Sequence, residues 1–253
     1  MPLEFRDTDE LRDSYFWHVD LSGSVLRACD LNDVKIVGSD ISNLRINGHA
    51  GRAGTVIVDD VDVTAYVDAE LDRRFPELIQ MRGMKTADDF RATWRTVEEL
   101  WDATVIRAQR LPPEALDERV DHEWSFIETI RHLVFATDVW VGRMLHGIEL
   151  PFHELSLPTA GYPPEGARDM GINVDAKPSL SEVLEAHAAR RSQMNNALAV
   201  LDEAMLDESR TGSPAPAWGE ETVTVRDCLF TVIEEHIQHR RFAVRDLSVL
   251  EHR

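Results

Sequence analysis

The sequence predicts a mainly α-helical protein, in which a small right-handed β-solenoid segment precedes a four-helix bundle. Two observations predict this fold class. After Thr86, apolar residues recur at three- and four-residue spacing in four long segments, as in amphipathic helices. Before that point, aliphatic residues recur at every fifth position, a period that neither a helix nor a simple strand produces. We therefore divide the chain into a repeat segment, residues 1–70, and a helical bundle, residues 71–253.

The composition is that of a folded protein with a strong negative charge. Hydrophobic residues make up 43% of the 253 residues, enough to form a core. The 46 acidic and 27 basic residues give a formal net charge of -19, which argues against partners that are nucleic acids or anionic membranes. No stretch of about 18 uninterrupted apolar residues is present, and the first residues lack the apolar run of a signal peptide. We therefore expect a cytoplasmic protein.

The five-residue repeat has one large and one small position. The large aliphatic residues are Leu21, Leu26, Leu31, Ile36, Ile41 and Ile46. The mostly small residues two positions earlier are Val19, Ser24, Cys29, Val34, Ser39 and Leu44. This pattern suits a square β-solenoid, in which the large residue fills the axis and the small one points inward where the corners crowd. Stretches such as DLSGS and DLNDV resemble the pentapeptide-repeat family. The alternative is a set of short strands and turns with accidental periodicity.

The segment between the repeats and the bundle contains a strand and a short helix. Residues 54–63 alternate apolar and polar after Val58, which predicts a closing strand. Residues 65–78 then predict a short helix that runs into Pro76.

The first two bundle helices follow. Thr86 is a suitable N-cap for the first, and Pro112 and Pro113 end it. The second is expected from about Trp124 to Leu145, because apolar residues continue at helical spacing over that range.

The second half of the bundle begins with a long connection. Residues 147–178 are rich in Pro and Gly, and loops of this size inside a domain are usually functional covers. The Ser-Leu-Ser-Glu run at 179–182 is a capping box that opens a third helix, through about Leu201. Residues 207–224 read as a turn-rich break, and the residues after it form the fourth helix.

The fourth helix carries the residues with the clearest chemistry. At 100° per residue, Glu235, His236 and His239 fall within its broad apolar face. Polar groups in such a face need partners or a metal, because an unpaired one costs about 1–3 kcal/mol. Glu235 and His239 are four residues apart and can converge on one ion, and His236 and His239 are three apart and can also converge. Helical angles alone do not choose between these pairs.

A partner is expected from the second helix. His132 lies there in the apolar context IRHLVFATDVW, where a lone histidine is more often a hydrogen-bonded core residue than a ligand. Its coincidence with the cluster on the fourth helix favours a ligand role. Three nitrogen and oxygen ligands with one open position are typical of a catalytic divalent metal.

These segments resemble a known family. The runs ETIRHLVFATDVW, PFHELSLP and EEHIQHRRFAVRDL resemble the DinB-like superfamily of metal-binding four-helix bundles, over about residues 86–253. More narrowly, they are similar to the mycothiol-dependent maleylpyruvate isomerase branch. The resemblance implies that His132, Glu235 and His239 are the metal ligands. The wider family has His-x-x-x-His on the last helix, and Arg240 departs from that form.

The resemblance also implies an activity. A divalent metal, zinc first and nickel as the alternative, would activate a low-molecular-weight thiol such as mycothiol for attack on an electrophilic small molecule. The protein would then be a metal-dependent thiol S-transferase or isomerase, and related bundles often form homodimers. His236 is expected to orient a ligand or transfer a proton, and His153 to cap the site from the long loop. Arg240 is expected to attract an acidic thiol or substrate, and Glu128 either to hydrogen-bond His132 or to be a carboxylate on the face of the helix.

The competing interpretation is a non-catalytic protein. Acidic pentapeptide-repeat proteins can resemble DNA in charge and bind DNA-handling enzymes, and the net charge of -19 fits such an interaction module. Its metal site would then be structural or vestigial. The tryptophans of the helices, Trp124 among them, are predicted to serve packing, as is Cys228.

Overall fold

The computed structural model describes residues 4–5, 8, 10–27, 29–46, 55–121 and 123–253. The chain divides into two compact units, Met1–Arg52 and Ala53–Arg253. Over the described residues, none of the helices combines the length and the apolar character that crossing a bilayer requires.

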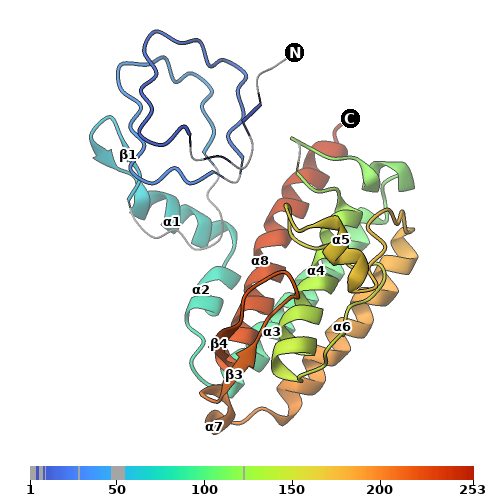
Figure 1. Ribbon diagram of the computed structural model, residues 1–253. Coiled ribbons are helices and arrows are strands. Elements are labelled where there is room, and N and C mark those ends of the chain that lie inside the picture. Colours follow the sequence, from blue (N-terminus) through green and yellow to red (C-terminus); the bar gives the residue numbers. More distant parts are fainter. Residues whose placement is uncertain (1–3, 6–7, 9, 28, 47–54, 122) are drawn as a thin grey trace. The chain divides into compact units, whose positions relative to one another are not determined.

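In the first unit, a four-residue turn recurs every ten residues, that is, in every second pentapeptide (Figure 1). The third residue of each turn has a positive φ, as type II turns require. These residues are Asp13, Gly23, Asp33 and Asn43. Three aspartates one position before the turns accept a hydrogen bond from the backbone two residues on, which stabilises the bend. They are Asp20, Asp30 and Asp40.

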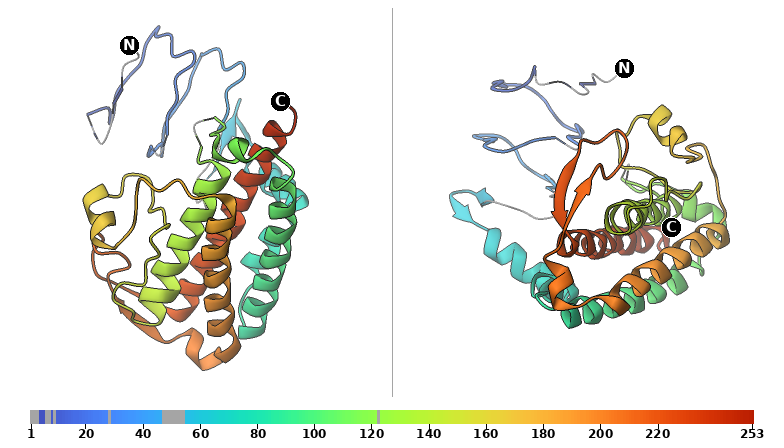
Figure 2. Two further views of the ribbon diagram at one scale, coloured as in Figure 1. Left: turned by 90° about the vertical axis from the view of Figure 1, so that its right-hand side faces the viewer. Right: turned by 60° about the horizontal axis from the view of Figure 1, so that its bottom comes forward.

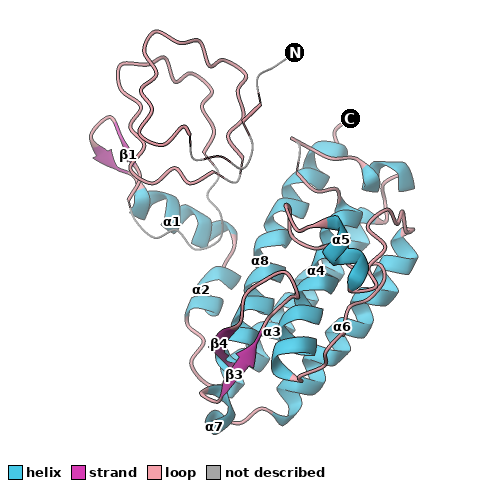
Figure 3. Cartoon of the chain, viewed as in Figure 1, coloured by secondary structure: helices cyan, strands magenta, loops and turns pink. Residues whose placement is uncertain are grey.

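The expected closed axis is not formed over the described part of this unit. The six large aliphatic residues of the repeat are between 42% and 65% exposed, and Cys29 is exposed as well. Residues 10–27 and 29–46 contain turns and no strand (Figure 3). The physical reason is length, because repeat units bury their apolar faces against neighbouring coils and about one and a half coils provide too few neighbours.

The second unit begins with a small hairpin and two short helices. β1 (Ile57–Val58) pairs antiparallel with β2 (Val61–Asp62), where a closing strand was expected. α1 (Thr64–Arg74) and α2 (Glu77–Arg82) follow in place of the single expected helix. Pro76 separates them, since its ring and missing N–H prevent a continuous helix.

Four long helices then form the bundle, as the sequence predicts. They are α3 (Ala87–Ala108), α4 (Phe126–Thr137), α6 (Leu180–Val200) and α8 (Val225–Leu250). Each begins with a capping box in which Ser or Thr and the acid three residues on exchange hydrogen bonds. α8 packs against α3 and α4, and α6 packs against the same two helices, which closes a ring of four (Figure 2).

The second helix departs from the prediction after Thr137. It continues as the π-helix η2 (Asp138–Leu145), which widens the backbone at a buried aspartate. Gly142 is required in this segment, because a Cβ there would lie 2.7 Å from the Cβ of Pro151. The long loop therefore lies directly against the helix.

The connections contain shorter elements. These are η1 (Pro113–Asp117), α5 (Pro164–Asp169) and α7 (Glu203–Leu206). Within the expected break at 207–224, β3 (Ser209–Gly212) pairs antiparallel with β4 (Glu221–Thr224). The long loop packs against the bundle in a second, small apolar core, in which Tyr162 of the loop meets Phe135 of α4, Val139 of η2 and Trp218 of the β3–β4 connection.

The main core lies between the four long helices. Phe90, Trp94 and Trp101 of α3 are at most 1% exposed and pack with Leu133 of α4 and Ile233 of α8. The expectation that Trp94 and Trp101 serve packing is confirmed.

Cys228 provides a pH test of this core. The side chain is fully buried, and burial raises the pKa of its thiol from 9.0 to about 12. The unfolded chain loses this proton near pH 9 and the folded chain near pH 12, so stability falls as pH rises between them. We expect the free energy of unfolding to drop by about 2 kcal/mol from this group between pH 8 and pH 10.5. Urea titrations at both pH values measure it. Cys228→Ala should lack this part of the drop. An equal drop in the variant and the unaltered protein would contradict the raised pKa of the Cys228 thiol.

Candidate metal centre

Three potential ligands from two helices converge on one point. His132 comes from α4, and Glu235 and His239 come from α8, which packs against it. Their ligand atoms all lie within 4.8 Å of one another. Oε2 of Glu235 is 3.3 Å from Nε2 of His132 and 3.0 Å from Nε2 of His239. The spacing of four residues on α8 places its two ligands on successive turns of one face.

A backbone carbonyl orients His132. Nδ1 of its ring lies 3.0 Å from the carbonyl oxygen of Leu157, which can only accept, so Nδ1 carries the proton and donates. Nε2 therefore presents its lone pair to Glu235 and His239. Metal-binding histidines are typically held by such a bond, which fixes both the tautomer and the ring direction.

The long loop is held in place by the residue before this histidine. Arg131 is 5% exposed and donates to the carbonyl oxygens of three loop residues, Leu155, Asn173 and Ala176. The N–H of Leu157 donates in turn to the carbonyl of Arg131. The carbonyl that orients His132 thus belongs to a segment anchored by several hydrogen bonds. Sequence patterns carry no signal for this arrangement.

Aromatic rings cover part of the cluster. Trp124 packs on His132 at 4.5 Å and stacks on His239 at 5.6 Å between ring centroids. Phe242 contacts His239 edge-on at 6.1 Å. Trp124 was expected to serve packing, and it packs against two of the three candidate ligands. No spacing rule could have found it, since it stands in the loop before α4.

The electrostatics favour an ionised carboxylate. Burial alone would raise the pKa of Glu235, but hydrogen bonds and charges from the protonated forms of His132 and His239 outweigh burial and hold the pKa well below its ordinary value. The side chain of His132 is 4% exposed, whereas those of His239 and Glu235 are 19% and 31% exposed. The cluster is therefore buried at one end and accessible to solvent at the other.

The donor set fits a divalent metal. Two imidazole nitrogens and one carboxylate oxygen are ligands of zinc and other first-row metals, and three protein ligands leave room for an exchangeable one. The accessible side at Glu235 and His239 is where such a ligand would enter.

His236 is not brought to this cluster. Its side chain is 1% exposed, Nδ1 donates to the carbonyl of Val232 at 2.7 Å, and Nε2 lies 3.2 Å from Nε2 of His187 on α6. Of the two pairs that helical angles allow, the fold brings Glu235 and His239 together, because α4 lies on their side and α6 on the side of His236.

Three other expected site residues have different partners. Arg240 donates to Glu77 of α2 and to Thr104 of α3. Its guanidinium is therefore engaged by these two helices and not available to attract a thiol at the cluster. Glu128 caps α4 and pairs with Arg119 instead of binding His132.

His153 is the third of these residues. It lies in the long loop, as expected, but its Nδ1 accepts the N–H of Leu155 in a local turn. None of its contacts among the described residues reaches His132, Glu235 or His239.

Comparison with known proteins identifies the family. Neither the curated proteins nor the solved structures contain a match to this chain. The profile of the DinB superfamily matches residues 96–243, more than half of the chain, and this range includes His132, Glu235 and His239. The chain belongs to the DinB superfamily.

Proposed function

We propose that the protein is a metal-dependent thiol S-transferase or isomerase. The observation that carries the proposal is the cluster of two histidines and one glutamate, closed by packing at His132 and accessible at Glu235 and His239. A purely structural site would be expected to enclose its ion with four protein ligands.

His132, Glu235 and His239 would hold the metal. A divalent ion bound there supplies a Lewis acid that keeps a coordinated thiol ionised near neutral pH. The ionised Glu235 offsets part of the positive charge. Zinc suits this donor set best, and nickel is the alternative.

The surrounding residues position and shield the reactants. Leu157 keeps His132 in the ligating tautomer, and Trp124 and Phe242 line the cluster with apolar surface. Such surface would exclude water from a thiolate held at the metal, and an electrophilic small molecule would be its substrate. The Glu-x-x-x-His form of α8 supports the isomerase branch, with mycothiol as a candidate thiol.

Cobalt substitution tests the proposal. Protein loaded with Co²⁺ is titrated with 2-mercaptoethanol and with mycothiol, and near-ultraviolet absorption is recorded. A thiolate-to-cobalt charge-transfer band that saturates with thiol is expected, together with faster conjugation of that thiol to an electrophilic substrate. Cobalt that binds without producing this band with either thiol would overturn the proposal.

The second candidate is a protein-interaction module. It is favoured by the exposed aliphatic residues of the first unit, such as Leu26 at 65%, and by the net charge of -19. A bound metal would then be structural, and cobalt would give no thiolate band.

A further inference from the structure

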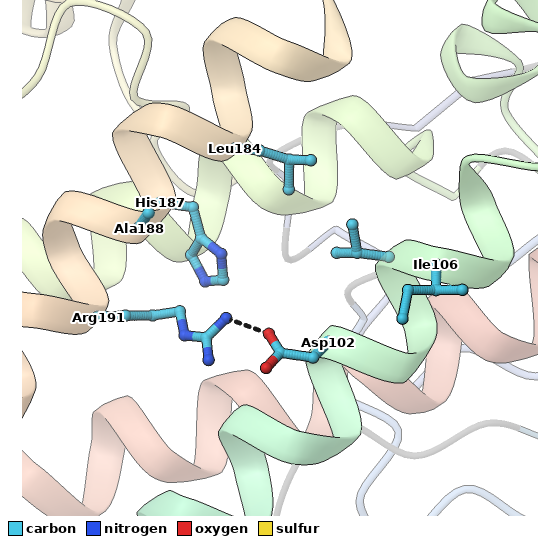
Figure 4. A pocket seen from close by; sticks show the side chains of 7 residues that line it. Asp102, Ile106, Leu184, His187, Ala188 and Arg191 are labelled. Carbon is cyan, nitrogen blue, oxygen red and sulfur yellow. Dashed lines mark hydrogen bonds and ion pairs between the residues drawn. The ribbon is translucent and has the colours of Figure 1, made fainter.

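A second candidate site lies on the other side of the bundle. α3 and α6 border a cavity of about 440 Å³ (Figure 4). Its apolar lining includes Val105 and Ile106 of α3 and Leu184 of α6. His187 of α6 also lines it, although its side chain is almost completely buried at 2% exposure.

The hydrogen bonds of two buried histidines determine which nitrogen of His187 is free. Nδ1 of His236 lies 2.7 Å from the carbonyl oxygen of Val232 and must donate to it. Nε2 of a neutral His236 is then an acceptor. Nε2 of His187 lies 3.2 Å away and must be the donor, since two facing lone pairs would repel.

Nδ1 of His187 is consequently an acceptor with a lone pair. It has no hydrogen-bond partner among the described residues. Burial lowers the pKa of His187 well below its ordinary value, so the ring is neutral. The ring is also held in place, with His236 stacked at 5.4 Å and Trp101 edge-on at 6.1 Å. An acceptor without a protein partner, in a ring that is held in place at the cavity wall, favours a ligand that donates to it.

The charged residues of the cavity indicate a neutral ligand. Arg191 donates to Asp102 at 2.5 Å and to Glu98 at 3.2 Å, so its charge is already paired. Figure 4 shows the Arg191–Asp102 pair bridging α6 and α3 below His187. A ligand anion would gain little from this paired arginine and would meet the carboxylate of Asp102.

We propose that this cavity binds a small phenol. The hydroxyl of the phenol donates to Nδ1 of His187, and its ring contacts Val105, Ile106 and Leu184. The site does not depend on the metal centre, since no candidate ligand of the metal lines the cavity.

Paired titrations test the assignment. Phenol and anisole have similar shapes, but anisole lacks the donor. Protein labelled with ¹⁵N in histidine is titrated with each, and imidazole nitrogens are followed by NMR. Phenol should shift the Nδ1 resonance of His187 and bind about fivefold to tenfold more tightly than anisole, the usual effect of one hydrogen bond. Equal affinities, or a shift confined to other histidines, would overturn the proposal.

Two variants locate the effect. His187→Phe keeps an apolar ring but removes the acceptor, so phenol and anisole should bind equally. Ile106→Ala should weaken both ligands and keep their ratio. Repeating the titration with His239→Ala separates this cavity from the metal centre. Phenol should bind to this variant as tightly as to the unaltered protein, because His239 does not line the cavity. If His187→Phe does not fold, the shift of Nδ1 in the unaltered protein decides the question.

Discussion

His239→Ala is expected to remove tight metal binding. The variant leaves His132 and Glu235 as the only members of the cluster, and two ligands do not hold a divalent ion against water. The loss of affinity should exceed the roughly 10–100-fold that removal of an outer hydrogen-bond partner causes. Elemental analysis after dialysis and calorimetric titration with Zn²⁺ measure the effect.

His252→Ala is the matched control. His252 is an exposed histidine near the end of the same chain, and its Nδ1 contacts the carbonyl of Ser248. This variant should bind metal like the unaltered protein. Zinc at about 100 times its Kd should raise the free energy of unfolding of His252→Ala and of the unaltered protein by about 2.7 kcal/mol. It should leave the free energy of unfolding of His239→Ala unchanged. Equal metal content in all three proteins would show that the cluster is not the site.

Arg190→Met is expected to cause the largest loss of stability. Asp138 at the start of η2 is fully buried, and Nε of Arg190 donates to it at 2.6 Å. Burial raises the pKa of Asp138, and the bond from Arg190 opposes that rise. Removing the arginine leaves a buried carboxylate without its counter-charge, which typically destabilises a protein by about 3–5 kcal/mol. Urea unfolding at pH 7 measures the loss.

The neighbouring arginine provides the comparison. Arg191 pairs with Glu98 and Asp102 of α3, and the side chain of Asp102 is 60% exposed. Arg191→Met should therefore lower stability by no more than about 1 kcal/mol. Adding Asp138→Asn to Arg190→Met should recover part of the loss, since an amide carries no charge. Equal losses in the two single variants would contradict the role given to the Asp138–Arg190 pair.

The Asp138–Arg190 pair also connects the bundle to the metal centre. Asp138 accepts hydrogen bonds from the backbone of His153 and the hydroxyl of Ser156. The residue directly after Ser156 is Leu157, whose carbonyl orients His132. Loosening the segment should therefore disturb the ligand as well as the fold.

Local signals account for the parts of the fold that were predicted. Thr86 with Asp89, and Ser179 with Glu182, are within one turn of each other, and both capping boxes form. The change to a π-helix at Asp138 was not predicted, because the apolar spacing continues unchanged through it, and the pairing of Asp138 with Arg190 joins residues 52 positions apart. The aliphatic repeat of the first unit was interpreted as a buried axis, but burial depends on how many coils are available to cover it.

The sequence alone determined where the bundle helices begin and that Glu235 and His239 share a face of α8, because capping and four-residue spacing act within a single helix. Only the tertiary structure decided that His132 meets this pair while His236 meets His187, and that Leu157 and Trp124 complete the surroundings. A helical angle gives the direction of a side chain, but the neighbour in that direction depends on how distant segments pack.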